Sequence, residues 1–237
     1  YWKGKRVGSG TIKWEARKLL AAGEIDDEEF IKLVVDAATS PGFCNTMGTA
    51  TTMNSLTEGL GMSLPGCASI PATLSERSEM AYLTGLRIVE MVKEDLTPTR
   101  IMTRESFENA VVLNSALGGS TNAPIHINAI ARHVGVEFKI EDWQKIGLNI
   151  PLIVNMQPSG KYLGEDFYRA GGVPAVMNSL LEAGKLNENA ITANGKTIAE
   201  NYYKSQILDK EVIRSLEEPI LEKAGFIILK GNICDAA

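Results

Sequence analysis

The chain has 237 residues, of which 44% are hydrophobic and 22% charged, and its formal net charge at pH 7 is −5. This composition is typical of a globular protein that is long enough to bury a core. The basic clusters, such as KGKR at 3–6, are short, so nucleic acid is not expected as a partner. We find neither an apolar window of membrane-spanning length nor a cleavable leader pattern, and therefore expect a soluble cytoplasmic protein with no membrane association.

Helical patterns dominate the first half of the chain. Residues 12–22 form a periodic run that ends at Gly23, and the acidic residues 26–28 supply a negative start for a helix through residue 40. A helix is predicted over 49–60, closed by Gly61, and a longer one over 75–95, with Pro98 beyond its end. The longer helix has a broad apolar face made by Met80, Leu83, Leu86, Ile88, Val89 and Met91.

The second half alternates helical patterns with short apolar runs. Helices are predicted over 103–119, over 120–135 with Pro124 in its first turn, and over 173–184. The runs at 136–140, 151–156 and 226–230 predict buried strands, and ITA and KTIAE around Asn194-Gly195 predict a hairpin. The alternation favours an α/β fold in which residues 1–237 form one domain with a mainly parallel sheet flanked by helices.

Cys44 is the best placed of three cysteines. Cys67 and Cys234 are far from it and there is no CxxC, so neither a disulfide framework nor a zinc knuckle is indicated. Cys44 directly precedes a predicted helix, where backbone N–H groups and the helix dipole favour a thiolate that could bind a metal or act as a nucleophile. A buried, inert thiol is the alternative. A nucleophile would need a base, and the two histidines, His126 and His133, fit structural roles better.

The turn GGSTNAP at 118–124 is a second candidate. It combines glycines, hydroxyls and an amide at a helix start, which suits a carboxylate or phosphate, although such residues are also ordinary helix caps. The carboxylates of the long helix, Glu76, Glu79, Glu94 and Asp95, include no pair that stands out as an acid–base couple. From the residues alone, the sequence indicates an α/β protein with one well-placed thiol and one turn suited to anions.

Five long motifs extend this interpretation. They are CNTMGTATTMNSLTEGLGMSLPGCASIPA (44–72), TRESFENAVVLNSALGGSTNAPIHINAIA (103–131), QPSGKYLGEDFYRAGGVPAVMNSLLEAG (157–184), NGKTIAEN (194–201) and GFIILKGN (225–232). In this order they resemble the dihydroxy-acid dehydratase and sugar-acid dehydratase family. CNTMGTA with the following TMN, and LKGN shortly before Cys234-Asp235, are similar to dehydratases of aldonates such as arabinonate and xylonate rather than to the enzyme of branched-chain amino-acid biosynthesis.

The resemblance implies a cofactor and a role for Cys44. Family members hold a [2Fe–2S] cluster with three cysteines, and Cys44 matches the last of them. Cys67 matches a position that tolerates other small residues and Cys234 matches no ligand, so both are expected to be ordinary thiols. It also implies a Mg²⁺ ion that orients the substrate, a serine base on a C-terminal barrel domain, and a homo-oligomer, dimer or tetramer. The other cluster cysteines, the magnesium ligands and the barrel are expected outside these residues, so this segment alone is expected to be inactive.

The substrate class follows from the residues after Cys44. If Cys44 binds iron, Asn45 and Thr46 are expected to bind the substrate, and a polar pair suits a small-molecule sugar acid, a pentonate or hexonate, that is dehydrated to a 2-keto-3-deoxy acid. A branched-chain dihydroxy acid is the alternative substrate. A further alternative, of another class, is an inactive binding or assembly domain with a vestigial cysteine.

Overall fold

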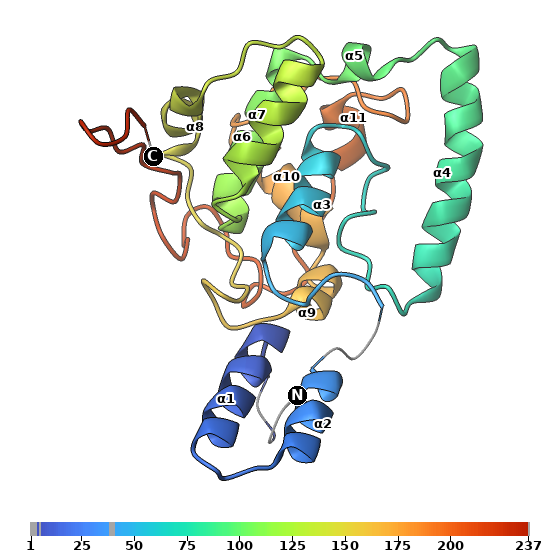
Figure 1. The fold of residues 1–237 in the computed structure, drawn as a ribbon. Coiled ribbons are helices and arrows are strands. Elements are labelled where there is room, and N and C mark those ends of the chain that lie inside the picture. The colour runs from blue at the N-terminus through green and yellow to red at the C-terminus, as the bar shows by residue number, and fades with distance from the viewer. Residues whose placement is uncertain (1–3, 5, 38–40, 237) are drawn as a thin grey trace.

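The structure is a computed structural model that describes residue 4 and residues 6–37 and 41–236. Helices are the dominant elements of the described residues (Figure 1). In chain order they are α1 (Ser9–Ala21), α2 (Asp27–Asp36), α3 (Thr49–Gly59), α4 (Ser75–Lys93), α5 (Pro98–Ile101), α6 (Arg104–Leu117), α7 (Ala123–His133), α8 (Ile140–Gly147), α9 (Gly164–Arg169), α10 (Gly172–Glu182) and α11 (Ile198–Tyr202).

The helices that the sequence predicts are confirmed, with ends that shift by a few residues. A predicted N-terminal cap and a predicted glycine stop form as expected. The Asp26 carboxylate accepts a hydrogen bond from the Glu29 N–H at the start of α2. Gly118 closes α6 in the left-handed conformation with φ 64°. The end of the second predicted helix, at residues 38–40, lies outside the described residues.

The predicted parallel sheet is not present among the described residues. They contain only four isolated bridges, of which Leu152–Leu221, Val154–Ile213 and Ile191–Thr197 are antiparallel and Met156–Tyr162 is parallel. Residues 152–156 are buried, but their backbone groups bond to Ala116 at the end of α6 and to the returning loop 212–221 instead of to strands. The runs at 136–140 and 226–230 form no bridge, and the hairpin consists of the Ile191–Thr197 bridge alone.

The core is built around α6. Every residue from Ser106 to Leu117 except Glu108 is buried, which is the pattern of a helix enclosed on all sides. Helices α3, α7, α8 and α10 pack against it. Two glycines permit close approach, because a Cβ at Gly59 would lie 2.7 Å from a methyl carbon of Leu113 and one at Gly147 would lie 2.6 Å from the Ser115 hydroxyl.

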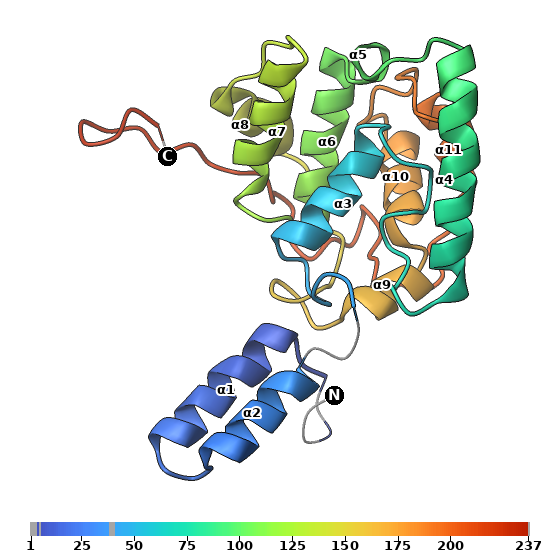
Figure 2. The same cartoon turned by 45° about the vertical axis from the view of Figure 1, so that its right-hand side comes forward.

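Two parts of the fold lie at the edge of this core. Figures 1 and 2 show α1 and α2 as a hairpin that projects from the body, and α4 along one side of it. Helix α4 buries no residue completely, so the apolar face predicted for 75–95 is largely exposed, with Leu86 and Val89 both 52% exposed. In the described part of the chain, no helix has the combined length and apolar character needed to cross a membrane.

Candidate functional site

A cleft of about 640 Å³ opens beside the N-terminal end of α3. Its lining comes from the segment before α3 and the first turns of that helix, from the loop between α3 and α4, from the start of α9, and from Arg6 and Arg77. The thiol, the side-chain amide and the hydroxyl groups of the lining belong to Cys44, Asn45, Thr51, Ser55, Ser69 and Thr73. The motif at 44–72 therefore supplies two separate parts of the lining of a single cleft, which we call its walls, one at 44–55 and one at 68–73.

Cys44 lies at the mouth of this cleft with an exposed side chain. Its Sγ is 3.4 Å from the Thr46 Oγ1, within hydrogen-bonding distance for sulfur. A Cβ built on Gly48, the N-cap residue of α3, would lie 3.7 Å from the same sulfur. The thiol thus sits against the N-terminal end of a helix and is accessible, which is the setting in which cysteines bind metals or react.

Asn45 and Thr46 occupy different positions relative to the cleft. Asn45 lines it and is exposed, and its backbone carbonyl accepts a hydrogen bond of 2.8 Å from the Gly164 N–H at the start of α9. Thr46 is half-buried behind the cleft lining, where its carbonyl accepts from the Thr51 hydroxyl. Of the two predicted substrate-binding residues, Asn45 is placed to reach a molecule in the cleft, and Thr46 is placed to orient the Cys44 sulfur.

Gln157, the first residue of the third sequence motif, joins the segment before α3 to the N-terminal part of the chain. Its backbone carbonyl accepts from the Met47 N–H at 2.7 Å, and its side-chain oxygen accepts from the Gly8 N–H at 3.0 Å. Nearby, the Arg6 guanidinium lies 3.2 Å from the Asp166 carboxylate, and both residues line the cleft. Motifs that are far apart in the sequence therefore meet at this site.

The part of the α3–α4 loop that lines the cleft is held by a buried carboxyl group that the sequence did not predict. Glu58, on α3, is completely buried, and its two oxygens accept hydrogen bonds from the Gly66 N–H at 2.7 Å and the Ala68 N–H at 3.0 Å. The Tyr202 hydroxyl donates to the same group at 3.3 Å. Burial raises the pKa of Glu58 to about 7, although the three hydrogen bonds act in the opposite direction.

A sequence signal for Glu58 does exist. Thr51, Ser55 and Glu58 follow at spacings of four and three, so they share one face of α3. The structure shows that this face begins in the cleft with Thr51 and Ser55 and continues into the interior with Glu58. An acidic residue in line with small polar residues and between leucines could thus have been recognised as a buried polar stripe.

The remaining sequence candidates lie elsewhere. Among the described residues, Cys67 is half-buried beside the Arg77 guanidinium at 3.5 Å, and Cys234 is exposed near the end of the chain. Both histidines are exposed on α7, and neither lines the cleft. The structure does not bring a histidine to the Cys44 thiol, so the nucleophile–base arrangement weighed from the sequence gains no geometric support.

The turn at 118–124 makes hydrogen bonds to α3. The Ser120 hydroxyl lies 3.0 Å from the Thr49 hydroxyl, the Asn122 side-chain amide donates to Thr49 at 2.8 Å, and the Ser120 N–H donates to Thr52 at 3.0 Å. These contacts fasten the start of α7 to α3. They give Ser120 and Asn122 of the turn structural partners within the chain.

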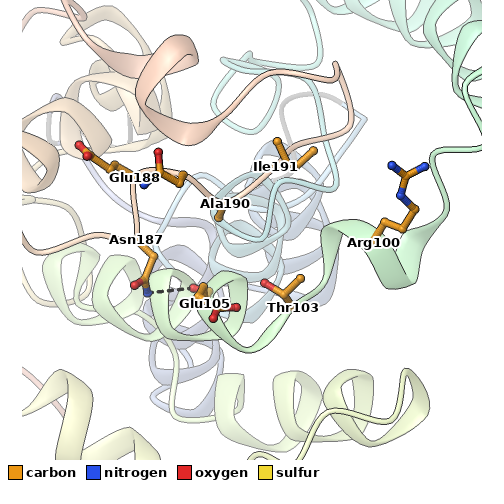
Figure 3. A pocket seen from close by; sticks show the side chains of 8 residues that line it. Arg100, Thr103, Glu105, Asn187, Glu188, Ala190 and Ile191 are labelled. Carbon is orange, nitrogen blue, oxygen red and sulfur yellow. Dashed lines mark hydrogen bonds between the residues drawn. The ribbon is translucent and has the colours of Figure 1, made fainter.

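A second pocket, of about 370 Å³, lies between the start of α6 and the loop 187–191 (Figure 3). The Asn187 side chain donates to the Glu105 carbonyl at 3.3 Å, and its backbone N–H donates to the Asn109 side chain at 2.7 Å. These bonds tie the loop to α6. No cysteine or histidine lines this smaller pocket, so the cleft at Cys44 is the better candidate site.

The donor atoms around the cleft fit one metal ligand rather than a complete set. Cys44 is the only thiol that lines it, and within residues 6–37 and 41–236 no group of three or more His, Cys, Asp or Glu side chains is placed to hold a metal ion. An accessible thiol at a helix N-terminus fits a thiolate ligand of an iron–sulfur cluster. The described residues thus fit a partial contribution to such a cluster.

Comparisons with known proteins agree with the motifs. Residues 3–201 match the family described as "Dihydroxy-acid/6-phosphogluconate dehydratase N-terminal". The chain is 55% identical over 231 residues to a D-xylonate dehydratase of Caulobacter vibrioides, 47% over 233 residues to an L-arabinonate dehydratase of Rhizobium leguminosarum, and 44% over 220 residues to a dihydroxy-acid dehydratase of Caldanaerobacter subterraneus. These matches cover 98%, 98% and 93% of this chain, but only 39%, 40% and 40% of the relatives.

Proposed function

Because the chain belongs to the N-terminal domain family of the dihydroxy-acid and 6-phosphogluconate dehydratases, we propose that the full-length protein carrying it dehydrates a sugar acid. The substrate is a pentonate or hexonate. The C2 proton and the C3 hydroxyl leave as water, and the resulting enol becomes a 2-keto-3-deoxy acid. Relatives named for D-xylonate and L-arabinonate support this substrate class.

The observation that carries the proposal is the position of Cys44. Its accessible thiol lies in the larger cleft, within the motif whose resemblance assigns it to a [2Fe–2S] cluster. In the proposed enzyme Cys44 is one ligand of that cluster, which supplies a Lewis acid for the departing hydroxyl when bound. The other cluster ligands, the Mg²⁺ ligands and the proton-accepting group come from the rest of the full-length protein.

The cleft lining supports a substrate that carries several hydroxyl groups. The Thr51 hydroxyl donates to the Thr46 carbonyl, and the Ser55 hydroxyl donates to the Thr51 carbonyl, so the oxygens of both are left to act as acceptors. Ser69 and Thr73 add hydroxyls from the wall formed by residues 68–73. A polyol chain supplies the donors that such acceptors require, whereas an alkyl chain does not.

Two alternatives are distinguished by different properties. In the first alternative, the same dehydration acts on a branched-chain dihydroxy acid, and a relative named as a dihydroxy-acid dehydratase is 44% identical to the chain. Hydroxyl and amide groups left unpaired by an alkyl chain would cost about 1 to 3 kcal/mol each, which favours the sugar acid. An inactive binding or assembly domain would need neither a cluster nor turnover.

The proposal is tested by replacing each cysteine in the full-length protein. We expect Cys44→Ser to lose most of the bound iron and sulfide, the visible absorbance of the cluster, and dehydratase activity. Cys67→Ser and Cys234→Ser serve as matched controls, and both should keep the cluster. Wild-type iron and sulfide content in Cys44→Ser would refute the ligand assignment, and a wild-type protein without cluster or turnover would favour the inactive domain.

A further inference from the structure

Glu58 connects α3 and the loop that follows it with α11, which is distant in the sequence. It belongs to α3, its carboxyl group binds two backbone N–H groups of the loop that follows, and the Tyr202 hydroxyl of α11 donates to it. The carboxyl group is enclosed, with no exposed surface. A buried carboxyl group is costly unless its hydrogen-bonding capacity is used, so its presence calls for a local explanation.

The hydrogen bonds of Glu58 fix the beginning of one cleft wall. Ala68, which donates to Glu58, is itself the first residue of the lining segment 68–73. Further along, the Ser69 hydroxyl accepts from the Val173 N–H at 3.1 Å, and the Arg77 guanidinium donates to the Ile70 carbonyl. Glu58 is thus the anchor on α3, the helix whose start also carries the Cys44 side of the cleft.

We propose that Glu58 is a positioning residue of the substrate cleft, which sets the distance between the wall formed by residues 68–73 and the wall that carries Cys44. This inference rests on the proposed function for the identity of the substrate. It does not make Glu58 a catalytic residue, because Glu58 does not line the cleft. One wall lies at the N-terminal end of α3 and the other belongs to the loop that follows α3. The Glu58 carboxyl group, by binding this loop to α3, fixes the separation of the two walls.

Two features of the site support this role. Both oxygens of Glu58 act as acceptors for backbone N–H groups, an arrangement that a glutamine of the same shape cannot reproduce because its amide nitrogen would face a donor. The raised pKa of Glu58 shows that burial acts strongly on the carboxyl group at this position. Tyr202 is the titratable side chain that contacts it among the described residues.

The test compares Glu58→Gln with a control that perturbs the core elsewhere. Trp143 on α8 is buried and its indole N–H donates to the Asn128 side chain at 2.9 Å, so Trp143→Phe removes one buried hydrogen bond at a helix that does not line the cleft. In the 237-residue chain, hydrogen exchange of peptides covering 62–73 should quicken by at least about tenfold in Glu58→Gln. It should be unchanged in Trp143→Phe. Equal acceleration in both variants would mean global loosening and overturn the inference.

The second arm measures function in the full-length protein. For Glu58→Gln we expect kcat/KM for pentonates to fall by about tenfold or more, mainly through KM, with unchanged iron and sulfide content. Glu58→Asp, which keeps the carboxylate one methylene shorter, should recover part of the loss. Unchanged kinetics in Glu58→Gln would overturn the inference. A wild-type protein without turnover would instead refute the proposed function and with it the substrate role, while the exchange experiment would still decide whether Glu58 holds the wall.

Discussion

Glu58 is the residue whose burial has the most direct consequence for stability. Its pKa is about 7 in the folded protein, compared with an ordinary value of 4.5. Between these two pH values the folded chain keeps a proton that the unfolded chain releases, so the free energy of unfolding falls as the pH rises through this window. The contribution is fully present below pH 4.5 and lost above pH 7, and its size is about 3 kcal/mol.

We therefore predict that Glu58→Gln removes this pH dependence. Urea unfolding of the 237-residue chain at pH 5 and pH 8 should show a smaller difference in the free energy of unfolding for Glu58→Gln than for the wild type. Glu79→Gln, at an exposed position of α4, serves as the matched control and should behave like the wild type. An identical pH dependence in the wild type and Glu58→Gln would contradict the prediction.

At the same scale, single residues show what the sequence could and could not provide. Cys44 was singled out because a glycine-rich segment before a helix start is visible in the sequence, and the structure does place its sulfur beside the N-cap glycine of α3. The Thr51–Ser55–Glu58 spacing places Glu58 on a polar stripe of α3, but its partner Tyr202 lies 144 residues away in the sequence. Contacts at such separation leave little trace in local patterns.

At the scale of elements, two glycines in helices are predicted to respond in opposite directions to the same change. A Cβ at Gly59 would meet a buried Leu113 methyl carbon at 2.7 Å, so Gly59→Ala should destabilise the protein by about 1 to 3 kcal/mol through overpacking of α3 against α6. A Cβ at Gly85 would have nothing within 4 Å, so Gly85→Ala should stabilise α4 by up to about 1 kcal/mol. Thermal unfolding of both variants provides the measurement, and a gain at Gly59 would show that Leu113 can move aside.

The elements also show why helices were easier to predict than strands. Caps, glycine stops and apolar periodicity lie within each helix, so α3, α4 and α6 could be located from their own residues. The run at 151–156 has the composition of a buried strand, and its residues 152–156 are indeed buried. Its hydrogen-bonding partners are a helix end and a loop, and nothing within the run itself distinguishes these from a neighbouring strand.

At the scale of the whole molecule, the chain spans about two fifths of the length of the relatives it matches. Since Cys44 is the only thiol among the described residues that line the cleft, we predict that the 237-residue chain alone forms no stable [2Fe–2S] cluster and has no dehydratase activity. Anaerobic reconstitution with iron and sulfide, followed by absorbance spectra and a 2-keto-acid assay with arabinonate, xylonate and dihydroxyisovalerate, tests this. Turnover of any of the three acids would contradict it.

Substrate specificity is a property of the full-length protein, because residues beyond this chain are expected to complete the pocket. Within the chain, the walls present the Asn45 amide and the Thr51, Ser55, Ser69 and Thr73 hydroxyls to the cleft. Thr51, Ser55 and Ser69 already make hydrogen bonds within the chain, so an alkyl substrate leaves unpaired only their remaining bonding positions and the Asn45 amide. A polar group that loses its partner in this way costs about 1 to 3 kcal/mol, which corresponds to one or two powers of ten in kcat/KM.

We therefore predict that the full-length protein prefers a pentonate or hexonate to dihydroxyisovalerate by at least about tenfold in kcat/KM. Competition kinetics with both acids present at once measures this ratio directly, because each acid competes for the same free enzyme. Asn45→Leu, which removes an exposed amide of the cleft, should narrow the preference by lowering kcat/KM for the sugar acid more than for the branched-chain acid. A preference of the wild type for dihydroxyisovalerate would assign the protein to the branched-chain substrate and would show that the polar cleft walls do not determine specificity.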